Sequence, residues 1–244
     1  MVQVCLNGAR SRAECAHLPV SPRELAAAAR EAVAAGARDV HVHPKDAGGG
    51  DTLEPAAVAA VLTAVREAVP GVTVGVTTGA WATPDPAARA AQVRAWTVLP
   101  DHASVNWHED GAADVASALL ERGVGVEAGI YSGTPAAERF RAWPHAHRVL
   151  RVLAEVTDTD PATAARTAAD LLDDLLDDLR EVTAAPILLH GEDGGAWPVL
   201  RLAAARRLAT RIGLEDVLRL PDGTSAEGNA ALVRAALEVV RQAS

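Results

Sequence analysis

The chain has 244 residues, of which 49% are hydrophobic and 23% are charged, as in globular rather than disordered proteins. Its net charge of −9 opposes phosphate backbones, so we do not expect nucleic-acid binding. Apolar runs stay well short of the roughly 18–20 residues that span a bilayer, and Met1–Gly8 lacks the features of a secretory signal. The two cysteines, Cys5 and Cys15, are too few for a disulfide framework. We therefore expect a soluble, cytoplasmic protein without a membrane partner.

Short β-like runs alternate with alanine-rich helical stretches along the chain. The predicted strands are Val2–Asn7, Asp39–His43, Val72–Thr77, His102–Asn106, Gly125–Tyr131, Arg148–Leu153, Ile187–His190 and Thr210–Glu215. The predicted helices lie near residues 22–34, 54–69, 85–97, 111–122, 134–142, 160–182, 197–208 and 226–242. Proline is expected in the first turn of four helices, at Pro22, Pro55, Pro86 and Pro161.

Eight consecutive βα units without a long linker predict an α/β fold, a single-domain (β/α)8 TIM barrel over residues 1–244. In such barrels the active site lies at the C-terminal ends of the strands. The alternative is a doubly wound open sheet. That fold has fewer strands as a rule, and the first predicted strand is not followed by a glycine-rich dinucleotide loop.

Alternate residues of a strand face opposite sides, so each predicted strand divides into an apolar and an inward set. The inward sets are unusually polar, with Gln3, Cys5, Asn7, His41, His43, Thr73, Gly75, Thr77, His102, Ser104, Asn106, Glu127, His190, Arg211, Gly213 and Glu215. Burying such groups without partners costs several kcal/mol each, so they must be paired, hydrated or bound to metal. Their gathering near the strand ends predicts an active site.

The pattern His41-Val42-His43 is the sharpest local signal. Two histidines at i and i+2 project the same way, about 6–7 Å apart along the strand, and can converge on one ion. In a closed barrel the last strand neighbours the first, so Glu215 can reach the same point. Two histidines and one carboxylate leave positions open for substrate, which suits catalytic Zn²⁺, and Fe²⁺ or Mn²⁺ fit the same set.

Further charged residues surround this predicted metal site. Arg211 is either a clamp for a carboxylate or enolate, or a structural ion pair with Glu127 or Asp216. Asp216 is the first candidate for a general base and Glu127 the second. His190 could be a further ligand, an acid or a hydrogen-bonded support. Asp46 is expected to cap its loop or to support the histidines.

With these residues in view, the chain resembles the β-keto acid cleavage enzymes, typified by 3-keto-5-aminohexanoate cleavage enzyme. The resemblance covers essentially the whole chain and rests on four motifs. These are NGA at Asn7–Ala9, HVHPKD at His41–Asp46, TTGA at Thr77–Ala80 and RIGLED at Arg211–Asp216. RIGLED is the most specific of them, because it carries a ligand, an arginine and an aspartate together.

The resemblance implies a Claisen-type acyl exchange, in which a β-keto acid and acetyl-CoA give acetoacetate and a new acyl-CoA. Zn²⁺ would be held by His41, His43 and Glu215. Asp216, oriented by Arg211, would take the proton between the two carbonyls, with Glu127 near the reacting carbons. The substrate-binding residues would be Asn7, Arg10, Thr77, Thr78, Ser104 and Asn106. The resemblance also implies a homo-oligomer, a dimer or a tetramer, and it is the sole basis for the coenzyme A partner.

Two positions depart from the family pattern. Lys45 stands where arginine is more usual, a modest change if the role is electrostatic. Arg10 follows the NGA motif where the amino-substrate enzyme carries a glutamate suited to an ammonium group. We infer a preference for a β-keto acid with a neutral or anionic side chain, although Arg10 would also suit a surface loop.

Three other functions are compatible with these residues. An amidohydrolase-type metal hydrolase also uses an HxH pair, but on its first strand and with a bridging lysine and further histidines. A metal-dependent aldolase or lyase acting without coenzyme A would use the same metal and enolate chemistry. A non-catalytic binding protein on a retained barrel is the third, and the intact ligand set argues against it.

Overall fold

The computed structural model describes residues 1–179 and 181–243. Its strands are β1 (Val2–Cys5), β2 (Asp39–Val42), β3 (Thr73–Thr77), β4 (His102–Asn106), β5 (Gly125–Tyr131), β6 (Arg151–Val156), β7 (Ile187–Gly191) and β8 (Thr210–Ile212). Its α-helices are α1 (Pro22–Ala35), α2 (Pro55–Ala68), α3 (Pro86–Ala95), α4 (Ala112–Glu121), α5 (Ala136–Arg141), α6 (Ala164–Leu179), α7 (Ala196–Ala205) and α8 (Asn229–Gln242). Short 3₁₀ turns cover Ala146–Arg148 and Asp193–Gly195.

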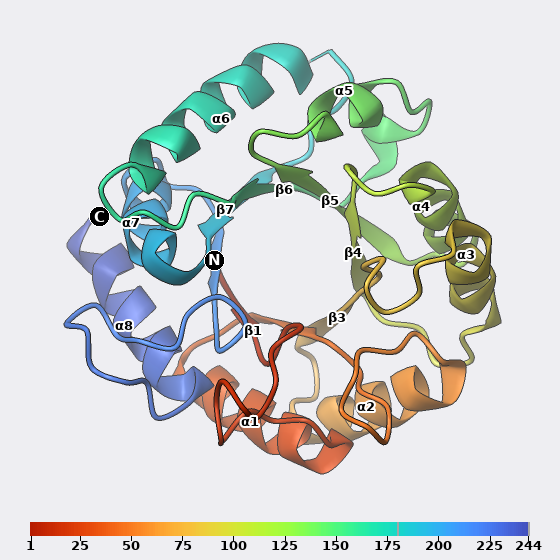
Figure 1. The fold of residues 1–244 in the computed structure, drawn as a ribbon, viewed down its shortest axis with the longest axis horizontal. Coiled ribbons are helices and arrows are strands. Elements are labelled where there is room, and N and C mark those ends of the chain that lie inside the picture. Colours follow the sequence, from red (N-terminus) through yellow and green to blue (C-terminus); the bar gives the residue numbers. More distant parts are fainter. Residues whose placement is uncertain (180, 244) are drawn as a thin grey trace.

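The strands form one parallel sheet that closes into a barrel. Neighbours follow the order β7-β6-β5-β4-β3-β2-β1-β8. A parallel bridge between Leu188 and Ala209 joins the two ends, where the Leu189 amide donates to the Ala209 carbonyl at 2.9 Å. The helices lie outside the ring of strands (Figure 1). The predicted (β/α)8 barrel is confirmed, and the open sheet is excluded by this closure.

Local sequence accounts for how the helices begin. Ser21 and Glu24 form a reciprocal capping box at the start of α1, and Pro22 occupies its first turn. Pro55 and Pro86 likewise occupy the first turns of α2 and α3, as predicted. Pro161 instead lies in a turn that leads into α6. Every helix within the described residues is too short or too polar to cross a bilayer.

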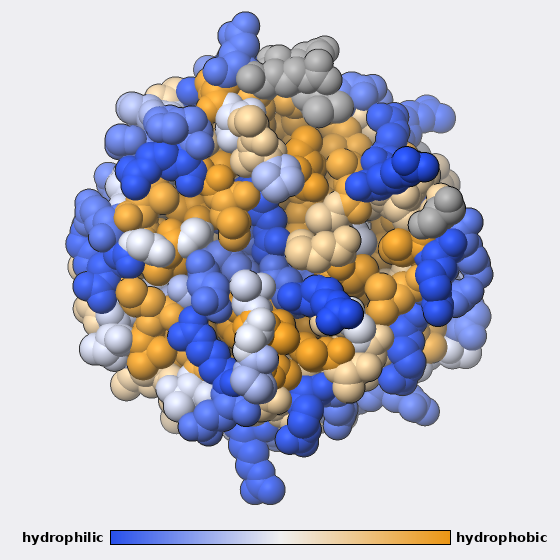
Figure 2. Space-filling view, turned by 180° about the vertical axis from the view of Figure 1, so that it is seen from behind, coloured by the Kyte–Doolittle hydropathy of each residue, from blue (hydrophilic) through white to orange (hydrophobic). Residues whose placement is uncertain are grey.

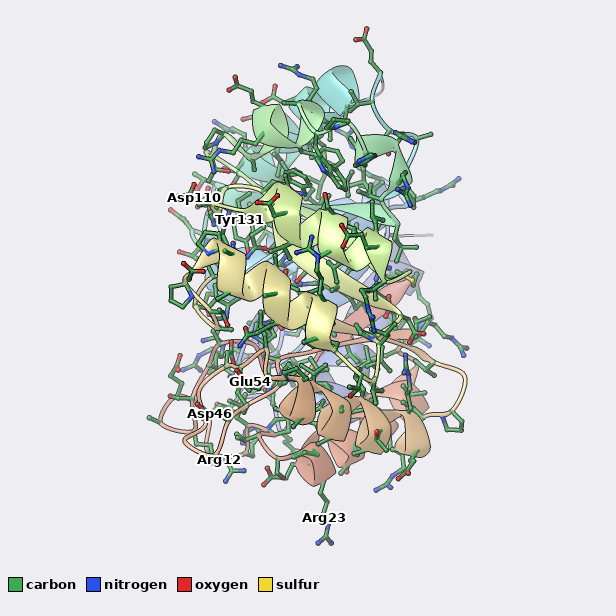
Figure 3. The ribbon with its side chains drawn as sticks, turned by 90° about the vertical axis from the view of Figure 1, so that its right-hand side faces the viewer. Arg12, Arg23, Asp46, Glu54, Asp110 and Tyr131 are labelled. Carbon is green, nitrogen blue, oxygen red and sulfur yellow. The ribbon has the colours of Figure 1, made fainter. Side chains whose placement is uncertain are left out.

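Two strands differ from prediction in ways that matter for the site. β6 begins at Arg151 rather than Arg148, because residues 146–148 form a 3₁₀ turn. β8 ends at Ile212 rather than Glu215, because the Gly213 carbonyl accepts the amides of Asp216 and Val217 and turns the chain. In the side view of Figure 3, Asp46, Asp110 and Tyr131 lie along one edge of the molecule, although they come after β2, after β4 and at the end of β5. The loops that follow the strands thus share one end of the barrel.

A buried ionic cluster closes the opposite end, where the strands begin. The ring of His102 contacts Asp39 at 2.8 Å and Glu127 at 2.9 Å, one carboxylate on each nitrogen. Arg151 pairs with the same two carboxylates, and Gln3 donates to Glu127 at 3.2 Å. Figure 2 shows the face turned away in Figure 1, with hydrophilic atoms at its centre inside a ring of apolar residues. We call Gln3, Asp39, His102, Glu127 and Arg151 the floor cluster.

The floor cluster is electrostatically matched. Burial would lower the pKa of His102, but Glu127 and Asp39 raise it to about 10. Burial would likewise raise the pKa of Glu127, but His102 and Arg151 hold it well below its usual range. Two cations therefore face two carboxylates. Gly75 on β3 makes room for the His102 ring, because a Cβ there would lie 2.0 Å from its Cε1 atom.

Candidate active site

Three potential metal ligands meet at the end of the barrel where the strands finish. One ligand atom from each of His41, His43 and Glu215 lies within 4.8 Å of the others. His41 Nε2 lies 3.9 Å from Glu215 Oε2, and His43 Nε2 lies 3.5 Å from Glu215 Oε1. The two imidazole rings are edge to face, with centroids 5.2 Å apart. The predicted convergence of strands β2 and β8 on one point is therefore present.

The NGA motif supports these ligands from the loop after β1. The Asn7 side chain donates to the His43 carbonyl at 2.9 Å and accepts its amide at 3.0 Å, which ties the end of β2 to this loop. Gly8 has φ +59°, and a Cβ there would lie 2.4 Å from Glu215 Cγ. Glycine at this position therefore lets the backbone pass directly over the carboxylate ligand.

Asp51 holds His43 in place. Its Oδ2 atom lies 2.8 Å from His43 Nδ1 and accepts the indole N–H of Trp81 at 2.6 Å, while Oδ1 pairs with Lys45. Trp81 also stacks on the His43 ring at an angle of 11°. Metal-binding histidines commonly carry a carboxylate on the nitrogen turned away from the ion. Burial would lower the pKa of His43, but Glu215 and Asp51 raise it to about 9.

Arg211 and Asp216 lie beside the ligand cluster. Arg211 Nη2 contacts Glu215 Oε1 at 2.9 Å and Asp216 Oδ1 at 3.1 Å. Of the two ion-pair partners predicted for Arg211, it therefore pairs with Asp216 and not with Glu127. Burial raises the pKa of Asp216, although Arg211 opposes this. Its Oδ2 atom is buried and has no hydrogen-bond partner among the described residues. That oxygen therefore has unused hydrogen-bonding capacity on a residue that lines the cavity.

His190 bridges Asp216 and a carboxylate on β6. Its Nε2 atom lies 2.7 Å from Glu155 Oε2, and its Nδ1 atom lies 3.5 Å from Asp216 Oδ1. Tyr131, at the end of β5, is the strand neighbour of Glu155 and lines the same side of the barrel mouth. Of the roles considered for His190, the structure places it outside the three-residue ligand cluster and within a chain of acid–base groups.

These groups line one cavity of about 420 Å³ at the mouth of the barrel. Arg10 forms part of its wall, donating to the Glu215 carbonyl at 2.9 Å and pairing with Asp193 at 2.5 Å. Glu14 lies 3.6 Å from the same guanidinium. The cavity is lined by Ala9, Arg10, Glu14, His43, Trp81, Tyr131, Glu155, His190, Glu192, Asp193, Arg211, Glu215 and Asp216.

Glu127, expected near the reacting carbons, lies away from the cavity at the mouth. This residue belongs to the floor cluster, where Gln3, His102 and Arg151 occupy its two carboxylate oxygens. It does not line the cavity at the mouth. The sequence correctly predicted that Glu127 faces the barrel interior. It lies near the beginning of β5, however, and its carboxylate therefore pairs with His102 and Arg151 of the floor cluster instead of lining the cavity.

Most of the predicted substrate-binding residues are also engaged within the protein. Thr77 accepts the Gly79 amide at 3.1 Å, Thr78 donates to the Ser104 carbonyl at 2.6 Å, and Asn106 donates to Glu109 at 2.9 Å. These bonds shape the loops after β3 and β4. Together with Asn7 and buried Ser104, they lie outside the set that lines the cavity, whereas Arg10 lies within it.

Asp46 serves as a loop cap and not as a partner of the histidines. Its Oδ1 atom accepts the amides of Gly48 and Gly50, at 2.8 and 3.0 Å. The histidine partner is Asp51, five residues further on, which sequence reasoning missed because its loop has no periodic pattern. Glu155 was missed because the predicted strand ended at Leu153. The alternation of Arg151, Leu153 and Glu155 against Val152, Ala154 and Val156 was the signal that could have found it.

The ligand cluster fits a divalent metal ion. The His41 Nε2 atom lies 3.9 Å from Glu215 Oε2, and this oxygen is buried and has no hydrogen-bond partner among the described residues. Burial lowers the pKa of His41 to about 4, so this ring is a neutral donor at physiological pH. Glu215 and Asp51 attract positive charge to His43, and a cation would supply it in place of a proton.

Fold and site together define the class of protein: a (β/α)8-barrel enzyme whose active site combines a candidate metal centre with a buried acid–base network. The model of one family, the beta-keto acid cleavage enzymes, matches residues 1–244. The chain therefore belongs to the beta-keto acid cleavage enzyme family. Among curated proteins, none matches it.

Solved structures with the same fold include ObcA. Its apo structure matches with a TM-score of 0.73 and 17% identity over 93% of this chain and 63% of that one. A ternary complex of ObcA with a C4-CoA adduct and oxalate matches with a TM-score of 0.73 and 16% identity over 93% and 64%. A geranylgeranylglyceryl phosphate synthase from Thermoplasma acidophilum matches less well, with a TM-score of 0.51 and 11% identity over 99% and 93%. This chain thus spans less than two thirds of the ObcA chains, and these likenesses establish the barrel fold.

Proposed function

We propose that this protein is a zinc-dependent β-keto acid cleavage enzyme of the acyltransferase type. It would convert a β-keto acid and acetyl-CoA to acetoacetate and a new acyl-CoA. The observation that carries the proposal is the meeting of His41, His43 and Glu215 with Arg211 and Asp216 at the mouth of the barrel. Family membership agrees with it, as does the ternary complex in which ObcA holds a C4-CoA adduct.

His41, His43 and Glu215 would hold the metal, with Asp51 fixing the ring of His43. When bound there, a divalent ion supplies Lewis-acid polarisation of the keto group. The mixed nitrogen and oxygen donors suit Zn²⁺, and Fe²⁺ or Mn²⁺ are the alternatives.

Asp216 would remove the proton from the carbon between the two carbonyls. Its Oδ2 atom has no hydrogen-bond partner in the described structure, so it can accept this proton. Arg211 holds Oδ1 and so fixes the carboxylate plane. The guanidinium also supplies positive charge where the enolate develops. The enolate carbon then attacks the thioester carbonyl of acetyl-CoA, and retro-Claisen cleavage completes the exchange.

Arg10 would face the side chain of the β-keto acid. Asp193 and Glu14 balance its charge, so its guanidinium offers hydrogen-bond donors rather than a free positive charge. This supports a neutral side chain better than an anionic one. An Arg10→Glu variant tested against neutral, acidic and amino β-keto acids should change the order of preference. An unchanged order would remove Arg10 from substrate selection.

The deciding experiment is an acyl-exchange assay on protein of measured metal content. Acetyl-CoA is offered with the panel of β-keto acids, and acetoacetate and the new acyl-CoA are followed by mass spectrometry. Chelation should abolish turnover, and adding back Zn²⁺, Fe²⁺ or Mn²⁺ separately identifies the metal. Glu215→Ala should abolish metal binding and turnover. Glu238→Ala, on the exposed face of α8, is the matched control and should preserve both.

Consumption of the keto acid without acetyl-CoA would contradict the exchange reaction and indicate a metal-dependent lyase. Turnover that survives full metal removal would contradict the role of the His41, His43 and Glu215 cluster. Absence of turnover in protein that holds one equivalent of metal would favour a hydrolase of amidohydrolase type.

A further inference from the structure

The exchange reaction moves protons at two different atoms, and the structure contains two acid–base groups in one cavity. The proposed role of Asp216 concerns the proton on carbon. Coenzyme A sulfur must also leave one acyl group and attack another, so its own proton needs a partner. His190 lies beside Asp216, lines the same cavity and has no task in the proposed mechanism.

The environment of His190 is that of an oriented acid–base group. Its Nε2 atom is held at 2.7 Å by Glu155, which fixes the ring and assigns the N–H on that side. The Nδ1 atom is buried and has no hydrogen bond within the described residues; the nearest carboxylate oxygen is that of Asp216 at 3.5 Å. A histidine whose ring lines a cavity, with one nitrogen bound by a carboxylate and the other left without a hydrogen bond, resembles the arrangement that activates nucleophiles in hydrolases.

Glu155 is itself secured as an anion. His190 Nε2 hydrogen-bonds its Oε2 atom at 2.7 Å. Burial would raise the pKa of Glu155, but His190 and Arg211 hold it below its usual value. Glu155 is therefore positioned to orient the imidazole rather than to react with substrate.

We propose that His190 is the acid–base group for the coenzyme A thiol, with Glu155 as its positioning residue; this inference rests on the proposed function. Two residues would then divide the proton transfers of one reaction. Asp216 would take and return the proton on C2 of the β-keto acid, and His190 Nδ1 would give and take the proton of the coenzyme A thiol.

Asp216 takes a proton from C2 of the β-keto acid, and C2 forms a bond to the thioester carbonyl carbon. The C–S bond breaks, its electron pair goes to sulfur, and doubly protonated His190 gives the Nδ1 proton to the thiolate. His190 then takes this proton back as sulfur bonds to the C3 ketone carbon. The C2–C3 bond breaks, its electron pair remains on C2, and Asp216 returns its proton there, releasing acetoacetate and the new acyl-CoA.

The test separates the two proton transfers. In D₂O without acetyl-CoA, exchange of the C2 hydrogen of the β-keto acid, followed by NMR above the enzyme-free rate, needs the carbon base but not the acid–base group for sulfur. His190→Gln should keep this exchange and lose acyl transfer by about 10²–10⁴-fold, the usual contribution of such a group. Glu155→Gln should show the same split to a smaller extent. Asp216→Asn should lose both activities.

The matched control is His147→Gln, an exposed histidine in the 3₁₀ turn before β6, which should preserve both activities. Thermal melting of each variant checks folding, and His190→Ala with added imidazole provides a second measurement. Rescue of acyl transfer by imidazole supports the role of His190. Full acyl transfer in His190→Gln, or equal loss of both activities in that variant, would overturn it. Wild-type protein that exchanges C2 hydrogen but never transfers acyl groups would instead overturn the proposed function.

Discussion

Two polar clusters lie inside the same barrel, and they differ in how completely they are satisfied. In the floor cluster both nitrogens of His102 and the oxygens of Glu127 have partners, and opposite charges are matched in number. At the mouth, buried polar atoms lack hydrogen-bond partners within the described residues, namely His41 Nδ1, His190 Nδ1, Glu215 Oε2 and Asp216 Oδ2. Leaving such atoms unpaired costs about 1–3 kcal/mol each. The fully paired floor cluster is thus arranged for stability, and the unpaired atoms at the mouth are arranged for chemistry.

The largest expected effect of a substitution in the mouth cluster is at Asp216. We expect Asp216→Asn to lower kcat/KM of acyl exchange by about 10²–10⁴-fold, because the amide cannot accept the carbon proton. The melting temperature should stay near that of the wild type, since the amide keeps the shape and can still accept from Arg211. Steady-state kinetics and calorimetry on the same preparation measure both. A large loss of stability with little loss of rate would show that Asp216 has a structural role and not a catalytic one.

The opposite pattern is expected for Glu127. Glu127→Gln removes one charge from a matched buried cluster and leaves His102 and Arg151 with a single carboxylate, Asp39. Breaking a buried ion pair in this way costs about 3–5 kcal/mol, measured as the free energy of unfolding in urea. The folded fraction should bind metal normally. If instead stability is unchanged and turnover is lost, Glu127 belongs to the reaction after all.

Asp51 should affect affinity rather than fold. Asp51→Asn weakens the charge that holds His43, and loss of such a carboxylate partner commonly lowers metal affinity by about 10–100-fold. Competition with a chelator of known affinity measures the change. Asp46→Asn, in the same loop but paired with backbone amides, is the control and should leave affinity intact. Equal effects of the two substitutions would indicate a general loosening of the loop.

The floor cluster also predicts how stability depends on pH. The pKa of His102 is about 10 in the folded protein, against roughly 6.5 in an unfolded chain. Because the folded value is the higher one, the stabilisation from His102 is complete below about pH 6.5 and is lost as the pH rises toward 10, by at most ~1.4 kcal/mol per pH unit. Urea unfolding from pH 6 to 10 should show this decline, and His102→Gln should flatten it. A wild-type profile as flat as that of the variant would show that His102 is neutral in the fold.

Sequence patterns identified which residues face the barrel interior. They did not show whether each residue lies in the floor cluster or in the site at the mouth. His41, His43, Arg211, Glu215 and Asp216 could be assigned together, because histidine spacing and barrel closure bring the ends of β2 and β8 to one point. Glu127 and His102 share the inward parity of that set. Their height along the strand, which depends on how far each strand is shifted against its neighbours, separates them from the site.

The order of strands and helices, the polar interior and the candidate metal-ligand set were determined by the sequence itself, since periodicity and residue type are local properties. The partners of those residues were decided by tertiary structure. Asp51 reaches His43 from a loop without periodic pattern, and Glu155 joins His190 only because β6 continues to Val156. Whether a buried charge is neutralised or left available depends on which side chains the closed barrel brings within hydrogen-bonding reach of it, and the linear pattern carries no record of that distance.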